Sequence, residues 1–256
     1  MSRSRRALLL RPSSKPPGYR ILWWPEANRA VVETVPLGKN PLYKNGDMKS
    51  LDAVTLHGRH VILQPMASDH AALLLACADR DRSTYAYTWV PANAAEASDY
   101  VSSALADRDS GISLPFVTLS AATGEIVGST RFLNIEYWRS AHAVNHRVGM
   151  PDAAEIGGTW LAKSAQRTPF NTEAKLLMLN HAFEAWGVQR LQLKTDARNV
   201  QSRTAIARIG AQFEGVLRSS MPRFNDQGPR DSAYFSIMPH EWPSVKEMLQ
   251  AKLAND

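Results

Sequence analysis

Residues 155–186 read EIGGTWLAKSAQRTPFNTEAKLLMLNHAFEAW, and this stretch decides the fold. Its first part is typical of a strand that ends at about Ala162, a polar loop follows, and a helical pattern starts at Pro169. Thr168 can cap that helix with its hydroxyl, and Pro169 at the first helical position gives up only an N–H that would lack a helical partner anyway. The loop and the first turn therefore aim several backbone N–H groups and the positive end of the helix dipole at one point. Such a point suits a phosphate or pyrophosphate, although most junctions of this kind bind nothing.

A second informative stretch, LKTDARNVQSRTAIARIGAQFEG, covers residues 193–215. It predicts a strand that ends at Asp196 and a helix that begins near Asn199, with Ser202 one turn further on. Asn and Ser are frequent helix caps, so one interpretation is that both residues only cap the helix. The alternative is that both polar side chains face a ligand, and the residues alone leave the two interpretations open.

The remaining elements follow from alternating apolar residues, turn residues and helix caps. In the first half of the chain we expect two short strands within 54–66 around Gly58, a helix at 70–79 capped by Ser68 or Asp69, and a helix at 94–108 after Asn93. A hairpin of strands 115–121 and 125–135 should follow, and then strands at 142–150 and 154–162. In the second half we expect a helix at 169–186 stopped by Gly187, a strand at 190–197, a helix at 200–209 ended by Gly210, strands at 213–221 and 231–238, and a helix at 241–253. This order predicts an α+β protein with one core, in which helices cover both faces of a mixed sheet.

The chain carries a formal charge of +6 over 256 residues, and this charge is unevenly distributed. Residues 1–50 contain ten Lys and Arg against three Asp and Glu, whereas the remainder contains 20 against 21. A nucleic-acid-binding surface on the folded domain is therefore unsupported. Because the first 50 residues are also Pro-rich and without periodicity, we expect a disordered extension or a mis-assigned start at 1–47 and the functional domain at 48–256. The competing hypothesis is that Trp23 and Trp24 dock on the domain, or that the basic start binds an anionic partner such as RNA.

Several classes of protein are disfavoured by what the sequence lacks. No stretch reaches the roughly 20 apolar residues of a membrane span, and the short apolar run near the N-terminus is too short for a signal peptide. Cys77, the only cysteine, lies in an apolar run and is expected to be buried and inert, which suits a reducing compartment. The pairs His57/His60 and His142/His146 lack nearby Cys or carboxylate ligands, so no metal is expected. We therefore expect a cytoplasmic protein.

Together the two stretches resemble the GNAT superfamily of acyl-CoA-dependent N-acyltransferases. Residues 166–174, QRTPFNTEA, lie where that family has a Q/R-x-x-G-x-G/A loop followed by T-E-A. Asn199-x-x-Ser202, with Gly210 at the end of the helix, resembles the N-x-x-S…G pattern of the branch that contains the RimJ/RimL-like ribosomal-protein alanine N-acetyltransferases. The resemblance covers roughly residues 51–240. It implies an α/β/α sandwich whose mixed, mostly antiparallel sheet splays open at an acyl-CoA cleft.

The resemblance also implies an activity, the transfer of an acetyl group from acetyl-CoA to a primary amine by direct attack. Backbone N–H groups of residues 167–172 would hold the CoA pyrophosphate, Asn199 would hydrogen-bond the pantetheine arm, and Ser202 would lie near the thioester or the phosphates. The expected acetyl-CoA contacts are Trp160, Leu161, Ala162, Gln166, Arg167, Thr168, Phe170, Asn171, Thr172, Asn199 and Ser202. Glu155, one strand length before the loop, is the candidate general base, and a purely structural carboxylate is the alternative.

The sequence departs from the family pattern at three positions. Pro169 and Asn171 stand where the family loop has glycines, and Ile206 stands where many relatives have a Tyr general acid. The proton for the leaving thiolate would therefore come from Ser202, from water or from no dedicated group. The acceptor would be a protein N-terminal α-amine or a small-molecule amine, and homodimers are common in the family. The rival class is a non-catalytic acyl-CoA-binding regulatory protein of the same fold.

Overall fold

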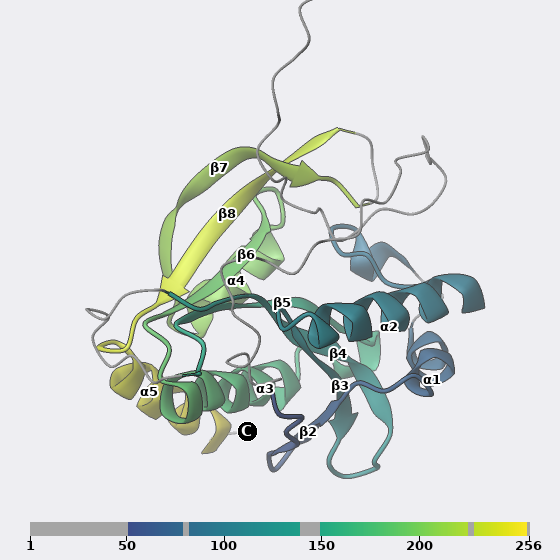
Figure 1. Ribbon diagram of the computed structural model, residues 1–256, viewed down its shortest axis with the longest axis horizontal. Coiled ribbons are helices and arrows are strands. Elements are labelled where there is room, and N and C mark those ends of the chain that lie inside the picture. The colour runs from purple at the N-terminus through teal and green to yellow at the C-terminus, as the bar shows by residue number, and fades with distance from the viewer. Residues whose placement is uncertain (1–50, 79–81, 139–148, 225–227, 255–256) are drawn as a thin grey trace, which may run out of the picture. The chain divides into compact units, whose positions relative to one another are not determined.

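The computed structural model describes residues 51–78, 82–138, 149–224 and 228–254. Within these ranges one eight-stranded sheet has the order β1-β2-β3-β4-β5-β6-β8-β7 (Figure 1). The strands are β1 (Leu56–His57), β2 (Val61–Pro65), β3 (Leu114–Ser120), β4 (Ile126–Glu136), β5 (Ala153–Leu161), β6 (Arg190–Asp196), β7 (Gln212–Pro222) and β8 (Pro229–Ile237). Only β5 and β6 pair in parallel, and every other neighbouring pair in the described sheet is antiparallel. The mixed sheet that the element order predicted is confirmed, and so is the mostly antiparallel pairing that the family resemblance implied.

Helices cover both faces of this sheet, as adjacent residues of β4 show. Ser129 accepts a hydrogen bond from Tyr100 Oη of α2 (Ala94–Asp109) at 3.0 Å, whereas Thr130 accepts one from Lys175 Nζ of α3 (Pro169–Asn180) at 3.3 Å. Neighbouring strand residues point to opposite faces, so α2 and α3 lie on opposite sides, as Figure 1 shows. The helices are α1 (His70–Cys77), α2 (Ala94–Asp109), α3 (Pro169–Asn180), α4 (Val200–Arg208) and α5 (Trp242–Ala254), with short turns η2 (Arg82–Tyr85) and η3 (Lys163–Ala165). Among the described helices, none has both the length and the apolarity to cross a bilayer.

Most of the predicted boundaries agree with the structure to within a few residues. Asn93 and Thr168 cap α2 and α3 with their side chains, whereas Asp69 precedes α1 without a side-chain cap. The expected helix at 169–186 changes character: its last six residues form the π-helical turn η4 (His181–Trp186) before Gly187 ends it with a positive φ of 76°. The turn η2 was not predicted. Most of the strand expected at 142–150 lies outside the described residues.

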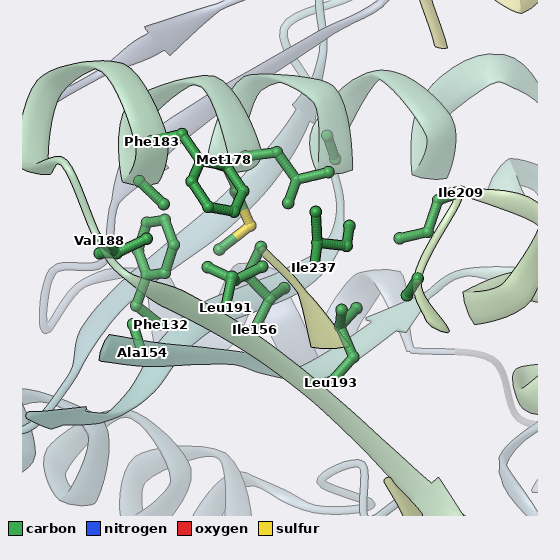
Figure 2. Close-up of a cluster of buried hydrophobic side chains, with 14 of the residues drawn as sticks. Phe132, Ala154, Ile156, Met178, Phe183, Val188, Leu191, Leu193, Ile209 and Ile237 are labelled. Atoms are coloured by element: carbon green, nitrogen blue, oxygen red, sulfur yellow. The ribbon is translucent and has the colours of Figure 1, made fainter. Parts of the chain in front are cut away.

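The main core lies between the sheet and α3, and Figure 2 shows a part of it. Side chains from β4, β5, β6 and β8 point towards the helix, including the fully buried Phe132, Leu191 and Ile237. Met178 and Phe183 meet them from the helical side. This packing fixes α3 on the sheet, and with it the loop and the helix N-terminus that the sequence singles out.

A buried carboxylate anchors the start of α3 to the edge of the sheet. Glu173 accepts hydrogen bonds from the backbone N–H groups of Arg59, His60 and Val61, at 2.8, 2.6 and 2.8 Å. Gly58 allows this close approach, because a Cβ there would meet Glu173 Oε2 at 2.4 Å. The T-E-A motif thus has a structural reason in this chain: its glutamate binds three backbone donors of the β1–β2 turn.

The sheet opens between β5 and β6, and we call this opening the fork. Pairing between the two strands ends at Glu155 and Gln192, although β5 continues to Leu161 and β6 to Asp196. Figure 1 shows β6 diverging from β5 beyond this point. A bulge on the β4 side accompanies the divergence, where Gly158 has a φ of 57° that favours glycine. The splayed sheet that the family resemblance implied is confirmed.

Candidate active site

The β5 edge of the fork presents a backbone donor that is turned away from β4 and has no partner among the described strands. The Ala162 N–H donates to Val127 O of the β4 side at 2.8 Å, so by strand alternation the N–H and C=O of Leu161 point the other way, towards the fork. The Leu161 carbonyl accepts from Gln166 Nε2 at 2.9 Å, and the same amide nitrogen donates to Thr84 Oγ1 at 2.8 Å. Of the backbone groups expected to pair with a pantetheine arm, the Leu161 N–H is therefore the one left to do so. The Gln166 side chain thus connects the end of β5 to η2 by hydrogen bonds.

The start of α3 presents fewer free backbone N–H groups than the six residues 167–172, which were expected to hold the pyrophosphate. An α-helix leaves its first four N–H groups without helical partners, here those of residues 168–171. Pro169 has no N–H, and the Phe170 N–H donates to Thr168 Oγ1 at 3.3 Å. The N–H groups of Thr168 and Asn171 remain for a ligand. Before them Arg167 has a left-handed φ of 59°, the backbone form from which anion-binding nests are built.

Arg208 brings a cation to this helix start. It lies at the end of α4, and its Nη2 donates to Thr172 Oγ1 at 3.2 Å. The Thr172 hydroxyl is therefore engaged, and the guanidinium stands beside the first turn of α3. Sequence reasoning missed Arg208 because the contact joins residues 36 positions apart. Its charge adds to the helix dipole, so the junction suits a pyrophosphate better than the sequence alone indicated.

Glu155 lies at the root of the fork. Its side chain is 3% exposed, and its Oε2 accepts from Asn134 Nδ2 at 2.9 Å and Gln192 Nε2 at 3.1 Å. Lys194 Nζ stands 3.0 Å from the same oxygen. Its other oxygen, Oε1, has no hydrogen-bond partner among the described residues. Donors from β4 and β6 thus fix one oxygen of the carboxylate, while the other oxygen stays available to accept a proton.

Of the two interpretations that the sequence left open for Asn199 and Ser202, the structure confirms helix capping, and a contact with a ligand stays a prediction. Asn199 Oδ1 accepts the Ser202 N–H at 2.9 Å, so Asn199 is a helix cap. Its amide nitrogen donates to no described residue and can still serve a ligand. Ser202 is half-buried and lies one turn before the buried Ile206, which places both on one face of the helix. Ile206 itself belongs to the core, so the position of the family tyrosine carries no acid here.

The other features of the described chain offer no alternative active site to the fork. A surface cavity of about 440 Å³ is lined by residues that include His57, His181 and Glu184, between β1 and the end of α3, and it contains none of the predicted site residues. Among the described residues, no group of three or more His, Cys, Asp and Glu side chains could hold a metal ion. His142 and His146 lie outside the described residues.

Comparison with known families decides the relationship. A family model described as the acetyltransferase (GNAT) domain matches residues 60–212. The chain belongs to the GNAT acetyltransferases. It is therefore an acyl-CoA-dependent N-acetyltransferase, and the fork is the part of the GNAT domain built from the residues that carried the resemblance.

Solved structures agree with this assignment. A GCN5-related N-acetyltransferase from Brucella melitensis is 26% identical, with a TM-score of 0.66 over 79% of this chain and 86% of that one. A protein from T. thermophilus, assigned as an acetyltransferase, is 30% identical, with a TM-score of 0.62 over 78% of this chain and 96% of that one. RimJ from Mycobacterium smegmatis, solved in complex with CoA-disulfide, shares the fold at 23% identity, a TM-score of 0.62, and coverage of 78% and 93%. Among curated proteins, none matches this sequence.

Proposed function

We propose that this GNAT acetyltransferase transfers the acetyl group of acetyl-CoA to a primary amine by direct attack, at the root of the fork. The acceptor is a protein N-terminal α-amine or a small-molecule amine. The observation that carries the proposal is the buried Glu155 carboxylate, placed where β5 leaves β6 and one strand length before the α3 start. A base and an anion-binding turn at the two ends of one unpaired strand edge are what acyl transfer from a CoA thioester requires.

The described residues fit acetyl-CoA. The Leu161 N–H would bind a pantetheine carbonyl, Asn199 Nδ2 would donate to the same arm, and the N–H groups of Thr168 and Asn171 with Arg208 would hold the pyrophosphate. Of the expected contacts, this set keeps Leu161, Thr168, Asn171 and Asn199. The Ala162 N–H is used by Val127 O, and Gln166, Phe170 and Thr172 have supporting roles. When bound, the thioester supplies an electrophilic carbonyl and a thiolate leaving group.

The protein's own part in the chemistry is proton transfer. An ammonium group must lose a proton before it can attack a carbonyl, and Glu155 Oε1 is the acceptor that we assign, directly or through one water. Asn134, Gln192 and Lys194 fix the carboxylate by its other oxygen, so its position does not change when Oε1 takes the proton. Ser202 or a water molecule would return a proton to the thiolate.

We further assign the chain to the RimJ/RimL-like branch. Support comes from the Asn199-x-x-Ser202 pattern and from structures of that branch with the same fold, including a protein described as a ribosomal-protein-serine acetyltransferase from Vibrio cholerae. This branch favours a protein α-amine over a small amine, and it favours a homodimer. An acetylation assay on short peptides with free N-termini and on small amines, read by mass spectrometry, decides the acceptor class. Acetylated peptide is the expected product. Acetyl-CoA binding without turnover on any amine would favour the non-catalytic alternative.

Cofactor analogues test the phosphate site. Acetyl-CoA should raise the Tm of the full chain through linkage, dephospho-CoA should retain most of the effect, and pantetheine should have far less, because only the first two carry the pyrophosphate. Arg208→Met should reduce the shift caused by acetyl-CoA, whereas Arg218→Met on the exposed part of β7 should leave it unchanged. Equal stabilisation by pantetheine and acetyl-CoA would overturn the pyrophosphate assignment.

Truncation tests the proposed domain boundary. We expect residues 48–256 to keep the Tm and the acetyl-transfer rate of the full chain, because the removal of a segment that does not pack on the domain would expose no apolar surface. Undocking Trp23 and Trp24 would instead cost several kcal/mol at about 25 cal/mol per Å². A truncated protein that melts much lower or loses activity would place the first 47 residues within the fold.

A further inference from the structure

The face of β6 and β8 turned away from α3 is polar. Leu191, Leu193, Phe235 and Ile237 fill the core, so the residues that alternate with them point to the opposite face. The register places Lys194 opposite Tyr234 and Asp196 opposite Ser232. Arg230, two residues before Ser232, shares their side of β8 and donates from Nε to the Ser232 hydroxyl at 3.1 Å. We call Lys194, Asp196, Arg230, Ser232 and Tyr234 the polar face.

Arg230 is buried without a carboxylate at ion-pair distance among the described residues. Its side chain is 6% exposed, and its guanidinium carbon lies 5.7 Å from the centre of the Phe224 ring. The Nε bond to Ser232 is its one hydrogen bond to the described part of the chain, which leaves both terminal nitrogens without an acceptor there. Burial lowers the pKa of Arg230, and the charges of Asp196 and Glu155 oppose this shift. An arginine nevertheless stays protonated, so a buried cation here lacks direct compensation.

The two nearby carboxylates are already engaged by other cations. Asp196 accepts from Arg198 with both oxygens, at 3.0 Å from Nε and 2.8 Å from Nη2, and Glu155 pairs with Lys194 at 3.0 Å. Arg198 is further held over the Tyr87 ring, 5.3 Å from its centre. Among the described residues of this face, three cations therefore stand against two carboxylates, and the cation left over is the buried Arg230.

We propose that Arg230 binds a carboxylate of the acceptor, so that the amines accepted by this enzyme are those that also carry a carboxylate. This inference rests on the proposed function. The acceptor then has two partners on one surface of the protein. Its amine faces Glu155, and its carboxylate accepts hydrogen bonds from the Arg230 guanidinium. A guanidinium can donate two parallel hydrogen bonds to a carboxylate, a geometry that an ammonium group cannot reproduce.

The test compares acceptors with and without the carboxylate, using the full chain and acetyl-CoA. Three pairs separate the sources of that group: an amino acid and its amide, a peptide with Asp or Asn at its second residue, and an ω-amino acid and its amide, whose amines differ little in basicity. At least one pair should show a kcat/KM about 10- to 100-fold higher for the acid, mostly through KM, as the loss of a charged hydrogen-bonded pair predicts. The pair that responds identifies the source.

Variants connect the preference to Arg230. Arg230→Met should bring the acid-to-amide ratio of kcat/KM close to one, whereas Arg230→Lys should restore part of the preference. Arg218→Met, which removes an exposed cation from β7, should preserve it. If Arg230→Met fails to fold, the acid-to-amide ratios of kcat/KM of the unmodified enzyme still show whether a carboxylate on the acceptor is preferred.

Equal use of acid and amide in all three pairs would overturn the inference while leaving the proposed function intact. A preference that survives in Arg230→Met would also overturn it. Absence of acetyl transfer to every amine, with acetyl-CoA bound, would instead contradict the proposed function itself.

Discussion

Replacement of Glu155 by glutamine is expected to lower kcat about 100-fold or more while changing acetyl-CoA affinity little. Glutamine keeps the shape of the side chain and an oxygen that can accept from Asn134 and Gln192, so the root of the fork should remain folded. It cannot take a proton from the acceptor ammonium. The measurement combines kcat with the acetyl-CoA-induced shift in Tm, because a general base contributes to the first and not to the second.

Glu173→Gln is the matched control for this prediction. Glu173 is also a buried carboxylate with three donors, but it holds the β1–β2 turn, away from the fork. We expect this variant to lower the free energy of unfolding and to leave kcat of the folded enzyme near normal. A near-normal kcat and an unaltered pH–rate profile in Glu155→Gln would assign Glu155 to structure, as the partner of Lys194.

Replacement of Lys175 by methionine is expected to stabilise the protein by about 3–5 kcal/mol at pH 6. Lys175 is buried beneath α3, where its Nζ donates to Thr159 Oγ1 at 2.7 Å and Thr130 Oγ1 at 3.3 Å. No carboxylate of the described residues lies within ion-pair distance of it. Burial lowers the pKa of Lys175 to about 7. Methionine has a similar length and no charge, so it should fill the same space without the cost of desolvation.

The gain should depend on pH in a defined direction. Between about pH 7 and the ordinary lysine pKa of 10.5, the unfolded chain binds a proton at Lys175 that the folded chain does not, so the stability of the unmodified protein rises with pH in this window. Below pH 7 both states are protonated, and the folded state bears the full cost of the buried charge. The advantage of Lys175→Met should therefore be largest at pH 6 and nearly vanish by pH 10.

Urea unfolding at pH 6, 8 and 10 measures this dependence. Lys246→Met is the control, because Lys246 is a partly exposed surface lysine paired with Glu184 at 2.6 Å, and its effect should be small. A destabilised Lys175→Met variant, or a difference in stability that does not change between pH 6 and pH 10, would show that Lys175 is charged and compensated in the fold.

Local sequence signals predicted the elements of the fold well. The cap residues Asn93 and Thr168 and the stop at Gly187 are each read from a few neighbouring residues, and all three are confirmed. The π-helical turn at the end of α3 was missed, because its apolar residues fit an α-helical pattern equally well. The fork itself came from the family resemblance, since no single strand shows where its pairing with a neighbour ends.

The site was predictable where function depends on one segment and not where it depends on contacts between segments. Glu155 and the start of α3 lie on one continuous stretch of sequence. The structure places both where the sequence predicted and reduces the number of backbone donors that the α3 start can offer. Lys194 and Arg230 alternate with apolar residues, a pattern typical of a solvated strand face, so nothing in the sequence indicated a buried guanidinium. Lys175 likewise looks like an ordinary polar position of a helix, and only the neighbouring strands reveal that it is buried.

The release of CoA thiol and the formation of acetylated amine can be followed together in a single reaction of the full chain with acetyl-CoA and an amine acceptor, which measures acetyl transfer itself. We predict that the two products form in equal amounts, that neither forms without the amine, and that Glu155→Gln slows both alike. Thiol release that continues without an acceptor would indicate hydrolysis. Tight acetyl-CoA binding with no product on any amine would contradict the assignment of an N-acetyltransferase site to the fork.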